Sequence, residues 1–205
     1  MSHSAEPTLP HPTSQAMLEQ AAALFAERGY DAVSVREIVD AVGVSKPVLY
    51  YHWQNKEALA RAIIQDFFKE AQALREAAFA PQNDLAGILR HYAEGMLNLA
   101  QVRRATLAFG LAVRFGRTSL RSLFDTMREQ DACIMGQWVE LLAARGLERA
   151  VAQRVAKTFW SLLFTELVAV LDCPQAVRPS HETASEIVQT LFHGVLNQRT
   201  PRSHA

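Results

Sequence analysis

The sequence predicts an all-α protein of about nine helices. Apolar residues recur at helical spacing along most of the chain, whereas the period-2 alternation that is typical of strands is almost absent. The 205 residues, of which 49% are hydrophobic and 20% charged, have the composition of a folded globular protein. We expect a three-helix domain over residues 14–55 and a larger helical domain over 56–197, between mobile tails at 1–13 and 198–205.

The first two helices are marked by the residues at their ends. Gly29 suits the left-handed position just after a first helix. Ser34 and Glu37, three residues apart, form a capping box that predicts the start of a second helix. Gly43 is then expected to end this second helix after a short run.

The later helices are marked by caps and turn residues. Ser45 is expected to cap a third helix that tolerates Pro47 in its first turn, and Asn55 to cap a fourth that runs to about residue 79. Turn signals divide the rest of the chain at Gly116, Gly146, Pro174 and Pro179. The further helices are expected near 84–100, 102–113, 118–145, 148–171 and 181–197.

Composition and motifs argue against several classes of protein. The 21 basic and 21 acidic side chains cancel, so any surface for nucleic acid or membrane must be local. Cys133 and Cys173 are too few for a disulfide framework or a four-cysteine zinc site, so we expect no metal or cofactor and a cytoplasmic location. The longest apolar stretch, 158–171, contains Glu166 and is shorter than the roughly 20 residues that span a membrane. No hydrolase, metalloprotease or nucleotide-binding motif occurs, so we do not expect an enzyme.

Residues 34–53 have the length and layout of a helix-turn-helix, in which the second helix lies in the major groove of DNA. The apolar positions that face inward in such a unit are Val35, Ile38, Val39, Val42, Val44 and Leu49. The outward positions of the second helix carry a cation, two phenols, an imidazole and two apolar residues that suit a thymine methyl: Lys46, Tyr50, Tyr51, His52, Pro47 and Val48. Lys56, at the start of the next helix, is expected to hold a phosphate. A packing corner with exposed aromatics is the alternative.

The residue pattern of the first sixty positions is more specific than the generic helix-turn-helix motif. It consists of Leu18, Ala21, Ala22, Leu24, Phe25, Ala26, Glu27, Arg28, Gly29, Tyr30, Asp31, Ser34, Val35, Ile38, Gly43, Val44, Ser45, Lys46, Leu49, Tyr50, His52, Trp53, Asn55, Lys56, Glu57 and Leu59. This segment, about 14–60, strongly resembles the DNA-binding domain of the TetR family of bacterial transcriptional regulators. The resemblance implies a homodimer, most often a repressor, that binds a palindromic operator in double-stranded DNA and is released by a small-molecule effector.

Matching positions, and for Tyr51 the outward face of its helix, identify the residues expected to contact DNA. They are Arg36, Lys46, Pro47, Val48, Tyr50, Tyr51, His52 and Lys56. The tail before the first helix departs from the family pattern, because it carries His3 and His11 where many members have lysine or arginine. The DNA surface must therefore depend on the placement of a few cations, and we expect modest affinity.

The larger domain carries no family motif, so its chemistry is inferred from composition. Aromatic and methionine side chains at helical spacing would line a cavity for an apolar or amphipathic effector, or would simply be core. The candidates for this ligand site are Met96, Phe109, Arg114, Met135, Trp138 and Trp160. Arg114 would pair with a ligand carboxylate, although six arginines between 102 and 128 also fit a solvated basic face. Glu166, within an apolar run, either pairs across a dimer, anchors a ligand or faces water.

The last two helices are expected to form the dimer interface. The final helix carries a wide apolar stripe of Ile187, Val188, Leu191, Phe192, Val195 and Leu196. Paired with its copy, this stripe would complete a four-helix interface; alternatively, it packs within its own subunit. Two other functions remain open, a DNA-binding regulator without a small-molecule effector and an all-α carrier of small molecules.

Overall fold

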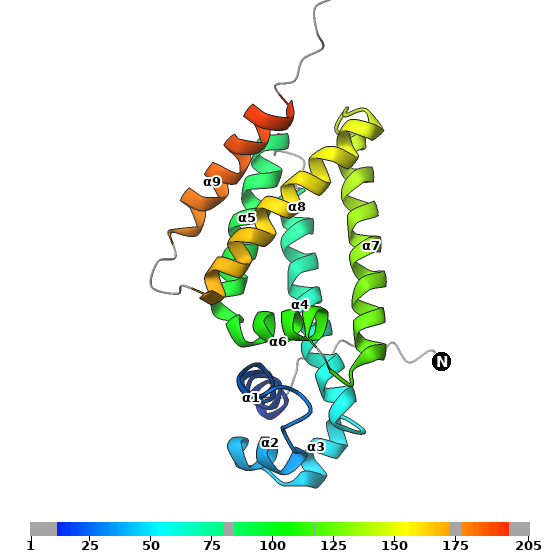
Figure 1. Ribbon diagram of the computed structural model, residues 1–205, viewed down its shortest axis with the longest axis vertical. Coiled ribbons are helices and arrows are strands. Elements are labelled where there is room, and N and C mark those ends of the chain that lie inside the picture. Colours follow the sequence, from blue (N-terminus) through cyan, green and yellow to red (C-terminus); the bar gives the residue numbers. More distant parts are fainter. Residues whose placement is uncertain (1–11, 80–83, 117, 173–177, 197–205) are drawn as a thin grey trace, which may run out of the picture. The chain divides into compact units, whose positions relative to one another are not determined.

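The computed structural model describes residues 12–79, 84–116, 118–172 and 178–196, and all regular structure in these ranges is helical (Figure 1). The prediction of an all-α fold is therefore confirmed. The α-helices are α1 (Pro12–Arg28), α2 (Val35–Val42), α3 (Lys46–His52), α4 (Lys56–Ala78), α5 (Leu85–Val102), α6 (Arg104–Phe115), α7 (Arg121–Ala144), α8 (Arg149–Asp172) and α9 (Ser180–Leu191). A π-helical turn, Phe192–Leu196, continues α9.

The chain packs as two compact units. The N-terminal unit comprises Met1–Phe67 with Ala105–Leu123, and the C-terminal unit comprises Phe68–Arg104 with Phe124–Ala205. The units divide the chain differently from the predicted domains, because α4 contributes to both and α6 joins the N-terminal helices. The reason for the second difference is packing: the ring of Phe109 on α6 lies 5.1 Å from the ring of Phe25 on α1.

The predicted boundaries of α2 are confirmed in detail. Ser34 Oγ accepts a hydrogen bond from the Glu37 amide, and the Glu37 carboxylate accepts one from the Ser34 amide at 2.8 Å. Gly43 follows the helix with φ 75°, a left-handed conformation that glycine adopts without a steric penalty. Residues 34–43 therefore contain the signals for both the start and the end of α2.

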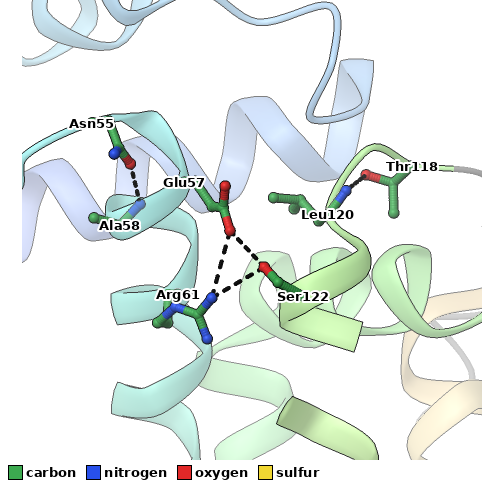
Figure 2. A network of polar contacts seen from close by, with 7 residues as sticks. All are labelled: Asn55, Glu57, Ala58, Arg61, Thr118, Leu120 and Ser122. Atoms are coloured by element: carbon green, nitrogen blue, oxygen red, sulfur yellow. Dashed lines mark hydrogen bonds and ion pairs between the residues drawn. The ribbon is translucent and has the colours of Figure 1, made fainter. Parts of the chain in front are cut away.

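The caps of the next two helices differ from each other. Ser45 precedes α3 as predicted, but its side chain makes no capping hydrogen bond, so the expected cap is wrong in its chemistry. Asn55 does cap α4, because its Oδ1 accepts a hydrogen bond from the Ala58 amide at 2.8 Å (Figure 2). Helix α1 begins at Pro12, inside the predicted tail; residues 1–11 and 197–205, where the mobile tails were expected, lie outside the described residues.

The C-terminal unit is organised around α5, which packs against α8 and α9 (Figure 1). Its core is aromatic: Tyr92, Trp138 and Phe159 are each at most 2% exposed, and their rings contact one another. Gln101, near the end of α5, donates a hydrogen bond to the Ser180 hydroxyl at the start of α9 at 3.0 Å. Along the described helices, none is long and apolar enough to cross a membrane.

The apolar stripe of α9 corrects part of the predicted dimer interface. Ile187, Val188 and Leu191 are 5%, 8% and 0% exposed within a single chain, because α9 lies against α5. These three side chains are therefore core. Phe192 is half-buried, and the side chains of residues 195 and 196 lie outside the described set.

The predicted solvated basic face is also wrong for two of its arginines. Arg103 is 11% exposed and forms an ion pair with Glu70 at 2.7 Å. Arg104 donates a hydrogen bond to the Leu171 carbonyl at the end of α8. Both guanidinium groups thus tie α5 and α6 to neighbouring helices, because each lies where two helices meet. Arg117 lies outside the described residues.

Candidate nucleic-acid interface

Helix α3 presents a polar and aromatic surface to solvent. Tyr50 and Tyr51 are 49% and 85% exposed, and Lys46 and Pro47 are exposed beside them. Leu49 points the other way and is completely buried. The alternation follows from helix geometry, since residues on one side of a seven-residue helix can pack while the others face out. Two exposed phenols on one short helix are unusual for a surface without a partner.

The remaining predicted residues of α3 sit at the edge of this surface. Val48 and His52 are half-buried. The rings of Tyr51 and His52 meet edge-on with centroids 5.1 Å apart, and His52 also contacts the ring of Trp53 at 5.4 Å. The aromatic contacts restrict the orientations of these side chains at the end of the helix.

Helix α2 is fixed to α1 by a charged contact. Arg28 Nη1 lies 2.7 Å from a Glu37 carboxylate oxygen. Hydrogen bonds from the Ser34 amide and hydroxyl, and then from Arg28, lower the pKa of Glu37 to about 2. The carboxylate is therefore charged at neutral pH, and it holds both the first turn of α2 and the end of α1.

Lys56 has a structural environment that its position in the sequence did not predict. Its Nζ donates hydrogen bonds to the carbonyls of Tyr30 at 2.8 Å and Val33 at 2.7 Å, and it lies 4.0 Å from the centre of the Tyr30 ring. Burial lowers the pKa of Lys56, although the nearby Asp31 and Glu37 charges act in the opposite direction. The ammonium group joins the start of α4 to the connection between α1 and α2.

The connection between α6 and α7 is attached to the same region. The amide of Ser119 donates to an Asp31 carboxylate oxygen at 3.2 Å, and its hydroxyl donates to the other oxygen. These hydrogen bonds lower the pKa of Asp31. All the groups belong to the N-terminal unit.

A second attachment lies at the start of α7. Ser122 Oγ donates to Glu57 at 2.6 Å, and Arg61 donates to Ser122 Oγ at 3.2 Å while lying 3.5 Å from Glu57 (Figure 2). Because Glu57 and Arg61 stand one turn apart on α4, the serine bridges both. We call the Ser119 contact with Asp31 and the Ser122 contact with Glu57 and Arg61 the serine latch. The sequence indicated neither contact, because about 90 and 60 residues separate the partners.

The cations of the predicted DNA surface are not equivalent. Arg36 is exposed and lies 3.5 Å from Asp40, one turn along α2. Lys46 is exposed, and among the described residues it has no ion-pair partner. His3 and His11 lie outside the described residues. Lys46 is thus the cation most available to a phosphate.

Residues 17–63, which contain α2, α3 and their supports, match the family model described as "Bacterial regulatory proteins, tetR family". This segment of the chain is therefore a TetR-type helix-turn-helix domain. One curated relative is the HTH-type transcriptional repressor KstR2 of Mycolicibacterium smegmatis, which is 33% identical over 86 residues, covering 40% of this chain and 42% of the relative. Another is the repressor ComR of Escherichia coli, 33% identical over 84 residues and 40% of each chain. The chain thus spans less than half the length of the curated relatives it matches.

Solved structures show that the TetR fold extends through the C-terminal unit. The ketosteroid transcriptional regulator KstR2 of Mycobacterium tuberculosis has a TM-score of 0.67 and 19% identity, and the match covers 92% of this chain and 96% of that one. A TetR-family regulator from Bordetella parapertussis has a TM-score of 0.66 and 21% identity, covering 94% and 100%. TetR proteins are regulators, in agreement with the expectation that the chain is not an enzyme.

The predicted ligand residues are divided between the two units. Phe109 and Arg114 belong to the N-terminal unit, where Phe109 packs on α1, so Phe109 is core of that unit. The other four candidates, Met96, Met135, Trp138 and Trp160, belong to the C-terminal unit. Aromatic and methionine spacing identifies buried positions, but it does not say which helices share a core.

Met135 lines a surface pocket between α7 and α8, and Trp138 is not part of its lining. The pocket has a volume of about 420 Å³ and is lined by Met135, Gly136, Val139, Arg149, Gln153 and Lys157. Arg149 is paired with Glu140 at 2.6 Å. Glu166 is half-exposed on α8; its charge contributes to raising the pKa of Arg178, after the larger effect of the hydrogen bond to Glu186. Glu166 is therefore not an isolated buried charge.

Proposed function

We propose that the protein is a cytoplasmic transcriptional regulator that binds double-stranded operator DNA through α3 and acts as a repressor. The observation that carries this proposal is the exposed surface of Tyr50, Tyr51, Lys46 and Pro47 on the second helix of a TetR-family helix-turn-helix. Phenols and an ammonium group bind phosphate, and small apolar surfaces meet thymine methyl groups in the major groove. Relatives matched over this domain include KstR2 and ComR, both named as repressors.

The test is operator binding by Tyr50→Ala and Lys46→Ala variants. Both side chains are exposed, so both variants should fold like the parent protein while binding operator more weakly. Lys46→Ala should also reduce the salt dependence of binding by about one unit for each lost phosphate contact. Gln20→Ala, exposed on α1, is the matched control. Normal DNA binding by Tyr50→Ala would show that α3 is not the reading helix.

We further propose that two chains bind one approximate palindrome. A seven-residue helix reads few base pairs, and a dimer gains specificity by placing two such helices roughly 34 to 36 Å apart, in successive major grooves. The surface that supports a dimer is the exposed side of α8, where Phe164 is 36% exposed, together with half-buried Phe192. Footprinting should show two related half-sites, and full affinity for a single half-site would contradict the proposal.

A small-molecule effector is proposed to lower DNA affinity through α4. This helix begins with Lys56 in the N-terminal unit and continues into the C-terminal unit, so a tilt of its second half would move its first half. We expect a coupling free energy of about 1 to 3 kcal/mol between effector binding and DNA binding. Because such coupling is reciprocal, operator DNA should weaken effector binding by the same factor by which the effector weakens DNA binding. Equal effector affinity with and without operator would favour a DNA-binding regulator that no small molecule controls. Binding of the small molecule without any binding of DNA would favour the carrier.

A further inference from the structure

The surface pocket between α7 and α8 contains a glycine that close packing does not explain. Gly136 lies inside α7, where glycine is less favourable than alanine because its backbone loses more conformational freedom on folding. A Cβ atom at this position would meet no atom of a neighbouring helix within 4 Å. Gly95 on α5 differs, because a Cβ atom there would lie 2.8 Å from the Leu74 side chain. The missing side chain of Gly136 instead leaves the pocket open.

The lining of the pocket is apolar on α7 and polar on α8. Met135 and Val139 stand one turn apart on α7, and Val139 is 6% exposed. Arg149, Gln153 and Lys157 follow at intervals of four residues along one face of α8, over about 12 Å. The volume of about 420 Å³ falls within the range of small-molecule sites, roughly 300 to 1,000 Å³. The pocket thus offers an apolar wall and a polar wall to the same ligand.

The two cations of the pocket are not equivalent. Arg149 Nη2 lies 2.6 Å from a Glu140 carboxylate oxygen, so its charge is compensated within the protein. Lys157 is exposed, and among the described residues its ammonium group has no hydrogen-bond or ion-pair partner. Gln153, one turn before Lys157, adds two amide N–H donors. The pocket therefore carries one available positive charge beside an apolar wall.

We propose that this pocket binds a small amphipathic carboxylate, whose apolar part lies on Met135 and Val139 and whose carboxylate accepts hydrogen bonds from Lys157. An ammonium group forms charge-assisted hydrogen bonds with a carboxylate, and burial of the apolar part removes it from water. A single available charge matches a carboxylate better than a phosphate monoester, which carries about −1.5 to −2 at neutral pH. The lining belongs to the C-terminal unit alone, so the site does not depend on the proposed DNA binding.

The alternative occupant of the pocket is a second copy of this chain. Phe164, on the proposed dimer surface, lies two turns after Lys157 on α8. The pocket itself exposes Lys157, and lysine is depleted in the interfaces between proteins. The observations therefore favour a small ligand, and the oligomeric state becomes one readout of the tests.

The first test needs no ligand. Gly136→Ala should raise the melting temperature by roughly 2 to 4 °C, because alanine favours the helix and its Cβ meets no neighbouring helix. Gly146→Ala is the matched control and should lower the melting temperature, since Gly146 has φ 92°, where alanine is strained. A fall for Gly136→Ala would show that the fold requires this glycine, and would overturn the proposal.

The second test measures binding by the protein with isotope-labelled methionine methyl groups. The probes are octanoate and its neutral counterpart, octanamide. Octanoate should shift the methyl signal of Met135 but not that of Met17, which is completely buried in the N-terminal unit. Octanamide should bind roughly three- to tenfold more weakly, because it forms no ion pair. Lys157→Met should abolish this preference, while Lys157→Arg retains it.

Two further variants separate the pocket from its surroundings. Arg154→Met removes an exposed cation of α8 that does not line the pocket, so it should leave the preference for octanoate unchanged. Gly136→Leu places a side chain in the open space of the pocket, so it should abolish octanoate binding. Sedimentation of Gly136→Leu should match that of the parent protein.

The proposal is overturned if octanoate leaves the Met135 signal unchanged, if octanamide binds equally well, or if octyl phosphate binds more tightly than octanoate. Loss of the preference in Arg154→Met would also overturn it. Monomers of Gly136→Leu would do the same, because the pocket would then belong to an interface between copies of the chain. DNA is absent from every measurement, so a failure of the proposed DNA binding would not affect the result.

Discussion

Two lysines near the recognition helix have opposite surroundings. Lys46 is exposed at the start of α3, whereas the ammonium group of Lys56 lies within 2.8 Å of two backbone carbonyls and above the Tyr30 ring. A side chain that satisfies buried carbonyls contributes to folding, and one in solvent remains available to a ligand. Whether each lysine stabilises the fold or remains available to a ligand therefore depends on its burial, since the residue type is the same.

Lys56→Met should destabilise the protein by about 1 to 3 kcal/mol, because the carbonyls of Tyr30 and Val33 lose a charged donor while the apolar stem is kept. Urea denaturation measures the change in the free energy of unfolding. Lys46→Met is the control and should leave stability unchanged, since Lys46 is exposed. Equal stability of the two variants would mean that Lys56 does not support the loop.

Glu37 predicts a pH dependence of stability. Its pKa falls from the usual 4.5 to about 2 in the folded protein, so its stabilising effect is fully present above 4.5 and is lost as the pH falls through 2. Glu37→Gln should therefore flatten the dependence of the melting temperature on pH within this window. Glu27→Gln, exposed on α1, should retain the parental dependence. A parental curve for Glu37→Gln would contradict the prediction.

A few polar contacts join the α6–α7 connection to the connection between α1 and α2, and the start of α7 to α4. The serine latch joins the α6–α7 connection to Asp31 through Ser119. It also joins the start of α7 to Glu57 and Arg61 through Ser122 (Figure 2). The partners are exposed, so each contact contributes less than a buried hydrogen bond would. Together with the buried side chain of Leu120, these contacts restrict the α6–α7 connection.

The double variant Ser119→Ala, Ser122→Ala should lower the free energy of unfolding by about 1 to 2 kcal/mol, and each single variant by about half of that. Chemical denaturation of the three variants measures both values. Ser161→Ala is the control, because that hydroxyl donates only to the Lys157 carbonyl within its own helix. Hydrogen exchange in residues 118–120 should accelerate in the double variant; unchanged exchange would show that the latch does not hold the connection.

The sides of α8 and α9 that face solvent differ from the sides that form the core. Leu191 is completely buried, whereas Phe164 on α8 is 36% exposed. A charge at position 191 would therefore test folding, and a charge at position 164 tests association. This distinction replaces the expectation that Leu191 lies in the dimer interface.

Phe164→Glu should give a folded monomer, because a charge in an apolar interface is costly unless it finds a partner. Sedimentation should show the smaller species, and operator affinity should fall roughly a hundredfold or more once the two half-sites are no longer linked. Leu191→Ala should instead lower stability by about 2 to 5 kcal/mol through a core cavity, while the protein that remains folded stays dimeric. A dimer of folded Phe164→Glu would place the interface elsewhere.

The helices, several of their caps and the family of the DNA-binding domain could be predicted from sequence because each depends on residues close together in the chain. The capping box of Ser34 and Glu37 needs three residues of spacing, and the exposed surface of α3 follows from helical periodicity around Leu49. Ser45 shows a limit of sequence-based prediction for helix caps, since a residue type that favours capping does not ensure a capping hydrogen bond.

Tertiary structure alone decided which side chains meet across long separations in sequence. Lys56 donates hydrogen bonds to two carbonyls that are more than 20 residues away in the sequence, and Arg103 forms an ion pair with Glu70. Leu191 is buried because α9 lies against α5. Periodicity states which face of a helix is apolar; the neighbour that this face meets depends on how helices pack, and burial then determines whether a charge is structural or available for binding.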